Sequence, residues 1–107
     1  MSIIELGKID FVSFKPESGE VVLTISDHLD WADDQNHLLV LQDKINAYLE
    51  FIESEQIHQE YPESIGRKLR IEIVSQYEYP KEGIDFLGKV KPVLESIGVS
   101  LSNKMLN

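Results

Sequence analysis

The chain has 107 residues, of which 42% are hydrophobic and 27% charged, and its formal net charge is −9 at pH 7. That length supports one compact core, so we expect a single domain over residues 1–107. The acidity argues against nucleic acid and anionic membranes as partners, because both are bound through Lys and Arg. The lack of cysteine excludes disulfides, thiol catalysis and thiolate metal sites.

The chain offers no membrane-spanning or secretory segment. No apolar run approaches the roughly 18 residues that a membrane span needs. The N-terminal sequence MSIIELGKIDF contains Glu5, Lys8 and Asp10 where a secretory peptide needs an uninterrupted apolar region. We therefore expect a cytoplasmic protein.

Two runs rich in β-branched and aromatic residues open the chain, at residues 9–14 and 20–26. Between them, Pro16 presets a turn and Gly19 can adopt positive φ without steric cost. The pattern predicts a β-hairpin. One side of its second strand should carry three apolar residues, Val21, Leu23 and Ile25.

A loop and then the longest helix follow, with Asp27 or Asp30 as the expected N-cap. Apolar residues spaced three and four apart predict the core-facing stripe of this helix: Leu38, Leu41, Ile45, Tyr48, Leu49 and Ile52. A face of the helix well away from that stripe should be exposed to solvent: Asp43, Asn46, Glu50 and Glu53. A narrower row lies between the two and is either covered by another element or an exposed apolar strip: Val40, Lys44, Ala47 and Phe51.

The second half of the chain predicts a strand, a helix and a short strand. Alternating polar and apolar residues indicate a strand over residues 67–79, which Pro80 ends. Residues 82–97 have helical spacing, with a kink or break expected at Pro92 and Gly98 as the C-terminal cap. The expected core stripe of this helix is Ile84, Leu87, Val90, Leu94 and Ile97. Residues 99–103 can form a final strand.

The order β-β-α-β-α-β, with strands polar on one side, predicts the fold class. It is an α+β two-layer sandwich, in which a four-stranded sheet carries both helices on one face. The strand order within the sheet stays open.

The net charge is concentrated in residues 27–63. This segment has ten acidic residues and one base, Lys44, whereas the other seventy residues have nine of each. Such a field raises the local concentration of cationic partners and speeds their association. Solubility alone would not require the excess to gather on a third of the chain, although a merely solubilising surface is the competing interpretation.

The sequence carries no recognisable catalytic motif, and it implies no cofactor. A metal-dependent enzyme built on His28, Asp30 and His37 is an alternative, because carboxylate and imidazole are suitable ligands. Their spacing matches no known metal motif, so helix capping and solvated carboxylates explain these residues better. The single tryptophan, Trp31, either staples the loop onto the core or anchors an interface.

Four stretches carry a resemblance to known proteins: ISDHLDWADDQN, LLVLQDKINAYLEFIESEQ, KLRIEIVSQYEYP and FLGKVKPVLESIGV. Together they resemble a bacterial family of small acidic domains of unknown function, over about Ile9 to Leu101. Small acidic domains without cysteine are also similar to the immunity proteins of polymorphic and contact-dependent toxin systems. The resemblance implies a fold and a setting, and it transfers no catalytic residue.

We therefore expect an immunity protein, an antitoxin without enzymatic activity that neutralises a cationic toxin domain such as a nuclease. A homodimeric adaptor domain is a further alternative, and the oligomeric state stays open. The residues expected to bind the partner are Asp27, Asp30, Trp31, Asp33, Asp34, Asp43, Asn46, Glu50, Phe51 and Glu53.

Overall fold

A four-stranded sheet forms one layer of the molecule, whose computed structural model describes residues 11–106. The strands are β1 (Phe11–Phe14), β2 (Val21–Asp27), β3 (Leu69–Ser75) and β4 (Val99–Met105). They lie in the order β1-β2-β3-β4, with β1 antiparallel to β2 and the other two pairs parallel. The predicted hairpin is confirmed, although residues 9 and 10 of its first strand lie outside the described residues.

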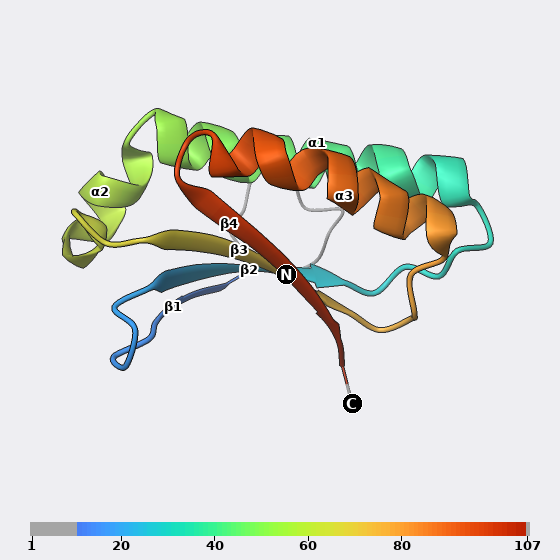
Figure 1. Ribbon diagram of the computed structural model, residues 1–107, viewed down its shortest axis with the longest axis horizontal. Helices are drawn as coiled ribbons and strands as arrows, with labels where there is room; N and C mark the ends of the chain where they lie inside the picture. Colours follow the sequence, from blue (N-terminus) through green and yellow to red (C-terminus); the bar gives the residue numbers. More distant parts are fainter. Residues whose placement is uncertain (1–10, 107) are drawn as a thin grey trace.

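Two long helices, α1 (Asp34–Glu53) and α3 (Lys81–Glu95), form the second layer and cover the same face of the sheet (Figure 1). Helix α1 joins β2 to β3 and α3 joins β3 to β4, so each parallel pair is connected by a helical crossover. A short helix α2 (Gln56–Glu60) and a 3₁₀ turn η1 (Pro62–Ser64) precede β3. The predicted α+β sandwich is confirmed, with α2 as an additional helix.

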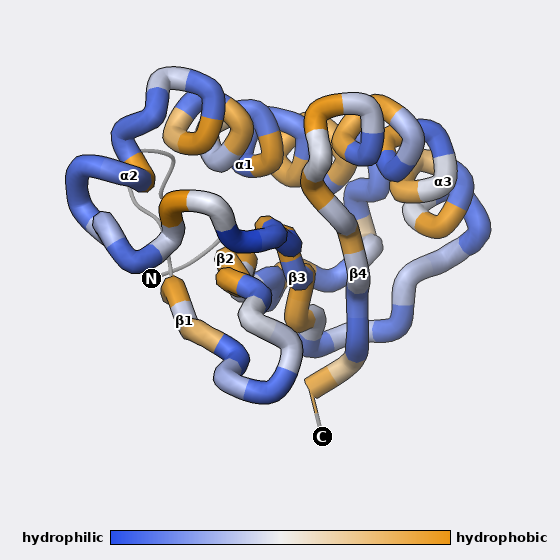
Figure 2. The backbone as a smooth tube through the Cα atoms, turned by 60° about the vertical axis from the view of Figure 1, so that its left-hand side comes forward, coloured by the Kyte–Doolittle hydropathy of each residue, from blue (hydrophilic) through white to orange (hydrophobic). Residues whose placement is uncertain are grey.

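The core lies between the sheet and the long helices and is built from alternate strand residues. Leu23 of β2 pairs in register with Ile71 of β3, which pairs with Leu101 of β4. This row packs against Leu41 and Tyr48 of α1 in one buried cluster. In Figure 2 the tube alternates between hydrophilic and hydrophobic positions along α1, as a helix with one buried side requires. The buried residues of β2 include the three predicted ones, Val21, Leu23 and Ile25.

Helix α1 begins after a different cap from the predicted one. Asp33 is the N-cap, because its Oδ1 accepts the backbone N–H of Asn36 at 3.1 Å. Asp30 accepts the N–H of Ala32 within the loop, and Asp27 ends β2. The predicted core stripe of α1 is confirmed, with Leu41, Ile45 and Tyr48 buried and Leu38, Leu49 and Ile52 half-buried.

Strand β3 is shorter than the predicted strand over residues 67–79. The Gln76 N–H donates to the Asp27 carbonyl and the Leu106 N–H donates to the Ser75 carbonyl, and these bonds close the ladder. Beyond them β2 has left the sheet for the loop and β4 has ended at Met105, so β3 has no strand along which to continue. Tyr79 therefore belongs to the connection before α3, where it is buried.

Helix α3 is continuous over Lys81–Glu95, so of the kink or break expected at Pro92 the break does not occur. Pro92 lies in the last turn, and its own carbonyl still accepts the Ser96 N–H at 3.1 Å. A proline so near the end removes one hydrogen bond without dividing the helix. Ile84 and Ile97, which were expected in the core, are 50% and 45% exposed.

Candidate protein-binding surface

The loop that joins β2 to α1 is anchored by a buried hydrogen-bonded cluster. Asp27 is the last residue of β2, and His37 lies in the first turn of α1. Nε2 of His37 lies 2.6 Å from Oδ2 of Asp27, and its Nδ1 lies 2.9 Å from the carbonyl oxygen of Asp30 in the loop. The same Asp27 oxygen accepts the hydroxyl of Tyr79 from the connection before α3. The cluster therefore ties two loops and a helix to the end of one strand.

Which groups donate hydrogen bonds in this cluster can be assigned from the groups that they face. A carbonyl oxygen has no proton to give, so Nδ1 of His37 donates to Asp30. Burial, reinforced by the hydrogen bond to Asp27 and by the charge of that residue, raises the pKa of Tyr79 far above its usual value. The phenol therefore stays protonated, as a donor to the Asp27 carboxylate, well above neutral pH.

Trp31 covers the cluster and packs the loop onto the core. Its ring stacks on His37, with 3.7 Å between ring centroids and 18° between the planes. Its centroid lies 4.9 Å from that of Tyr79 in an edge-on contact. Trp31 Nε1 is buried and has no hydrogen-bond partner among the described residues, so the contribution of the side chain is packing. The structure supports the stapling role for Trp31.

The cluster contains residue types that serve in acid–base catalysis, but their position does not suit that role. Asp27, His37 and Tyr79 are 2%, 1% and 8% exposed, and their polar atoms face one another. A general acid or base must come within hydrogen-bonding distance of a substrate proton. Buried in this way, the three side chains act as an anchor that holds the loop.

The structure does not assemble the alternative metal site. His37 is buried with both nitrogens engaged, and the Asp30 carboxylate accepts the Ala32 N–H. His28 is exposed. Within residues 11–106, no group of three or more His, Cys, Asp or Glu side chains is placed to hold a metal ion.

Seven of the predicted partner-binding residues are exposed on the loop and on the outer side of α1. We call them the acidic surface: Asp30, Asp33, Asp34, Asp43, Asn46, Glu50 and Glu53. At 100° per residue, the last four fall within an arc of about 80° on the helix. Leu39 lies on the same side, one turn before Asp43, and is 60% exposed. The surface therefore combines carboxylates with an apolar side chain.

Among residues 11–106, no base cancels the charge of the acidic surface through an ion pair. None of its side chains forms a salt bridge with a lysine or arginine of residues 11–106. Two ion pairs formed by arginine or lysine lie on the sheet instead. Nη2 of Arg70 lies 3.0 Å from Oε2 of Glu20, and Nζ of Lys104 lies 3.6 Å from Oε1 of Glu72. Lys44, the single base in residues 27–63, is fully buried beside the ring of its helix neighbour Tyr48.

Two predicted partner-binding residues are not accessible. Asp27 is 2% exposed and belongs to the anchor, and Phe51 is 6% exposed and belongs to the core. Trp31, within the loop itself, is half-buried. The narrow row on α1 is covered: Val40 and Ala47 are half-buried, and Lys44 and Phe51 are buried. An adaptor domain therefore has no exposed strip there, and pairing through an open sheet edge, the other surface expected for it, stays a prediction.

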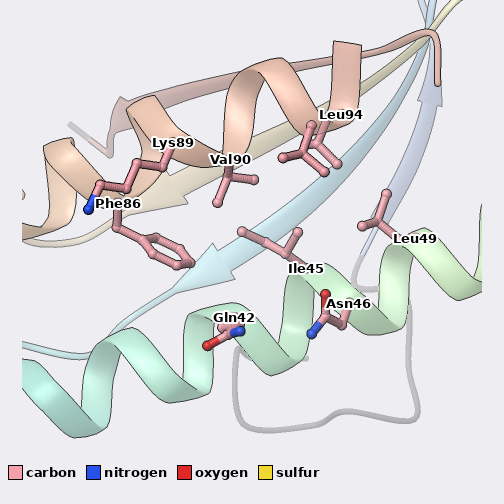
Figure 3. A pocket seen from close by; sticks show the side chains of 9 residues that line it. Gln42, Ile45, Asn46, Leu49, Phe86, Lys89, Val90 and Leu94 are labelled. Atoms are coloured by element: carbon pink, nitrogen blue, oxygen red, sulfur yellow. The ribbon is translucent and has the colours of Figure 1, made fainter. Parts of the chain in front are cut away.

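A groove between α1 and α3 is a feature that the sequence analysis missed. It encloses about 250 Å³, with the buried residues Ile45 and Leu94 at its base. Figure 3 shows Phe86 and Val90 of α3 pointing toward Ile45 of α1. Asn46 of the acidic surface also lines the groove, so the two features are continuous. The sequence signal for it was the spacing of Phe86, Val90 and Val93 along α3 and of Ile97 in the turn after it.

These features define a small α+β domain with an anchored acidic loop and a grooved helical layer. The chain belongs to a family of unknown function, DUF6572, whose sequence model matches residues 1–107. This match confirms the predicted resemblance to a family of unknown function, while the similarity to immunity proteins stays a prediction. No curated protein and no solved structure matches the chain. Among the helices of residues 11–106, none is long and apolar enough to cross a membrane.

Proposed function

We propose that this protein is an immunity protein, which binds a cationic toxin domain through the acidic surface and blocks it. The observation that carries the proposal is the exposure of these carboxylates, none of which forms a salt bridge with a lysine or arginine of residues 11–106. A nuclease is the favoured target class, because a cleft that binds nucleic acid phosphates is itself lined with Lys and Arg. Blocking such a cleft requires no catalytic step in the inhibitor.

Carboxylates on a rigid surface can occupy the positions that phosphate groups take in the target. Asp30 and Asp34 flank the segment that His37 and Trp31 fasten to the core. A loop that is already ordered loses little conformational entropy on binding, so more of the electrostatic attraction appears as affinity. The same field speeds encounter at low salt, which an inhibitor of a lethal enzyme needs.

The test is growth protection against the toxin domain encoded beside the gene for this protein. One variant reverses three exposed acids, as Asp34→Lys, Asp43→Lys and Glu50→Lys. Asp33 is left unchanged because it caps α1. The matched control makes the same change in charge at exposed acids outside the acidic surface, as Glu17→Lys, Glu78→Lys and Glu95→Lys.

We expect the first variant to lose protection and the control to keep it. With purified proteins, the association rate of the wild type should fall by roughly ten-fold or more from low to physiological salt. The first variant should associate slowly at all salt concentrations. Equal protection by both variants would overturn the proposal, as would a neighbouring gene that encodes no toxin domain.

A further inference from the structure

The groove between α1 and α3 has the size and lining of a site for side chains. Its volume of about 250 Å³ lies below the range of roughly 300–1,000 Å³ that small-molecule pockets occupy. Its walls are mainly apolar, with Leu49 from α1 and Phe86 and Val90 from α3. Such a shape suits a few aliphatic side chains presented by a larger partner.

Exposed apolar residues continue the groove along α3. Val93 lines it and is 61% exposed, and Ile97, four residues later in the turn that follows α3, is 45% exposed. With Phe86 and Val90 they form a row spaced four, three and four residues apart, which covers about three helical turns. Side chains at i, i+3 or i+4, and i+7 of a partner helix match a row of this kind. The groove therefore fits a helix laid along it.

The two edges of the groove carry different charges. On the α1 edge, Asn46 lines the groove and is followed one turn later by Glu50. Glu53 follows Leu49 by one turn on the same edge. On the α3 edge the groove is lined by Lys89. An occupant that matches both edges carries basic residues on the flank toward α1 and neutral or acidic residues toward α3.

We propose that this groove receives an amphipathic helix of the protein partner, with its basic flank against α1. The inference rests on the proposed function, since the acidic surface supplies the charge that selects the partner. A second copy of this chain is a poorer occupant, because two molecules with a net charge of −9 repel each other.

The first experiment uses a synthetic probe and so needs no knowledge of the partner. The probe is a roughly 18-residue helical peptide with leucines at i, i+3, i+4 and i+7, lysines on one flank and glutamines elsewhere. A scrambled peptide of the same composition is its control. Binding is measured by titration of the isotope-labelled full chain by NMR. Val93→Glu tests the groove, and Ile84→Glu is the matched variant at an exposed apolar residue of α3 outside it.

We expect the amphipathic peptide to shift the amide signals of groove residues, and Val93→Glu to weaken binding about ten-fold. Ile84→Glu should bind like the wild type, and the scrambled peptide should not bind. Equal binding by Val93→Glu or by the scrambled peptide would overturn the inference. Self-association in sedimentation that Val93→Glu abolishes would assign the groove to a second copy and overturn it as well.

The protection assay separates this inference from the proposed function. If Val93→Glu protects cells fully while the Asp34, Asp43 and Glu50 reversals do not, the groove is not used and the proposed function stands. If the variant with Asp34, Asp43 and Glu50 reversed protects cells fully, while Val93→Glu still weakens binding of the peptide, the groove binds helices and the proposed function fails.

Discussion

Nε2 of His37 and Oδ2 of Asp27 lie 2.6 Å apart at the buried junction of β2 and α1, ten residues apart in the sequence. The contact closes the loop between them, and the second ring nitrogen of His37 holds the loop at the Asp30 carbonyl. The shape of the acidic loop therefore depends on a pair of side chains that never reach the surface.

Removal of His37 should be strongly destabilising. His37→Ala leaves the Asp27 carboxylate buried with one partner fewer, and breaking a buried pair in this way costs about 3–5 kcal/mol. Urea unfolding followed by circular dichroism measures the loss. His28→Ala changes an exposed histidine of the same loop and should stay within about 0.5 kcal/mol of the wild type. Similar losses for both variants would contradict the anchoring role.

Tyr79 should make the protein sensitive to alkali. Its pKa is raised above the ordinary value of 10.0 by burial and then by Asp27, so the folded state keeps a proton that the unfolded chain releases. The contribution of this group to the free energy of unfolding is complete below about pH 10 and falls above it, by at most about 1.4 kcal/mol per pH unit.

Tyr79→Phe should remove this part of the alkaline slope, besides a loss of about 1.5–3 kcal/mol at neutral pH for the hydrogen bond to a charged group. Tyr77→Phe, at an exposed tyrosine two residues earlier, should retain the wild-type slope. Urea titrations between pH 8 and pH 11 compare the three proteins. Parallel curves for both variants and the wild type would show that Tyr79 does not titrate as expected.

Two glycines of α3 should respond in opposite directions to alanine. A Cβ at Gly83 would lie 3.0 Å from atoms of both Trp31 and Tyr79, so Gly83→Ala should cost about 1–3 kcal/mol. A Cβ at Gly88 meets nothing within 4 Å, and Gly88→Ala should stabilise the helix by about 0.4–1 kcal/mol. Thermal unfolding followed by circular dichroism compares them. A neutral Gly83→Ala would mean that Trp31 is not packed tightly against α3.

The acids of the acidic surface should divide into structural and surface roles. Asp33→Ala removes the cap bond to Asn36 and should cost about 1 kcal/mol. Asp43→Ala, in the exposed face of the same helix, should change the unfolding free energy by less than about 0.5 kcal/mol. Chemical denaturation gives both values. If Asp43→Ala is the more destabilising of the two, the exposed face contributes to folding as well as to binding.

The sequence pattern was sufficient for the fold class but not for the strand order, because the fold class depends on periodicity. Alternation in β2 and a three-to-four spacing in α1 each place one side in the core, and the structure follows them at Leu23, Ile25 and Leu41. The limits of the elements were harder to predict. The end of β3 depends on where its two neighbours, β2 and β4, end, which the residues of β3 do not encode.

The candidate site was predictable only in part. Exposure of Asp43, Glu50 and Glu53 follows from helical geometry alone. The burial of Asp27 does not, because it requires His37 and Tyr79, residues 10 and 52 positions away, to meet one oxygen atom. An aspartate beside other aspartates looks like a surface residue in the sequence, and only the tertiary contact assigns it to the interior.

Because Trp31 stacks on His37, its intrinsic fluorescence can report on the position of the loop. The chain contains one tryptophan, so all indole emission comes from the loop beside the acidic surface. The indole packs against the His37 and Tyr79 rings, so its environment, and with it its emission, changes when the loop lifts from the anchor. Release of the loop can be timed by stopped-flow fluorescence, without attaching any dye to the protein.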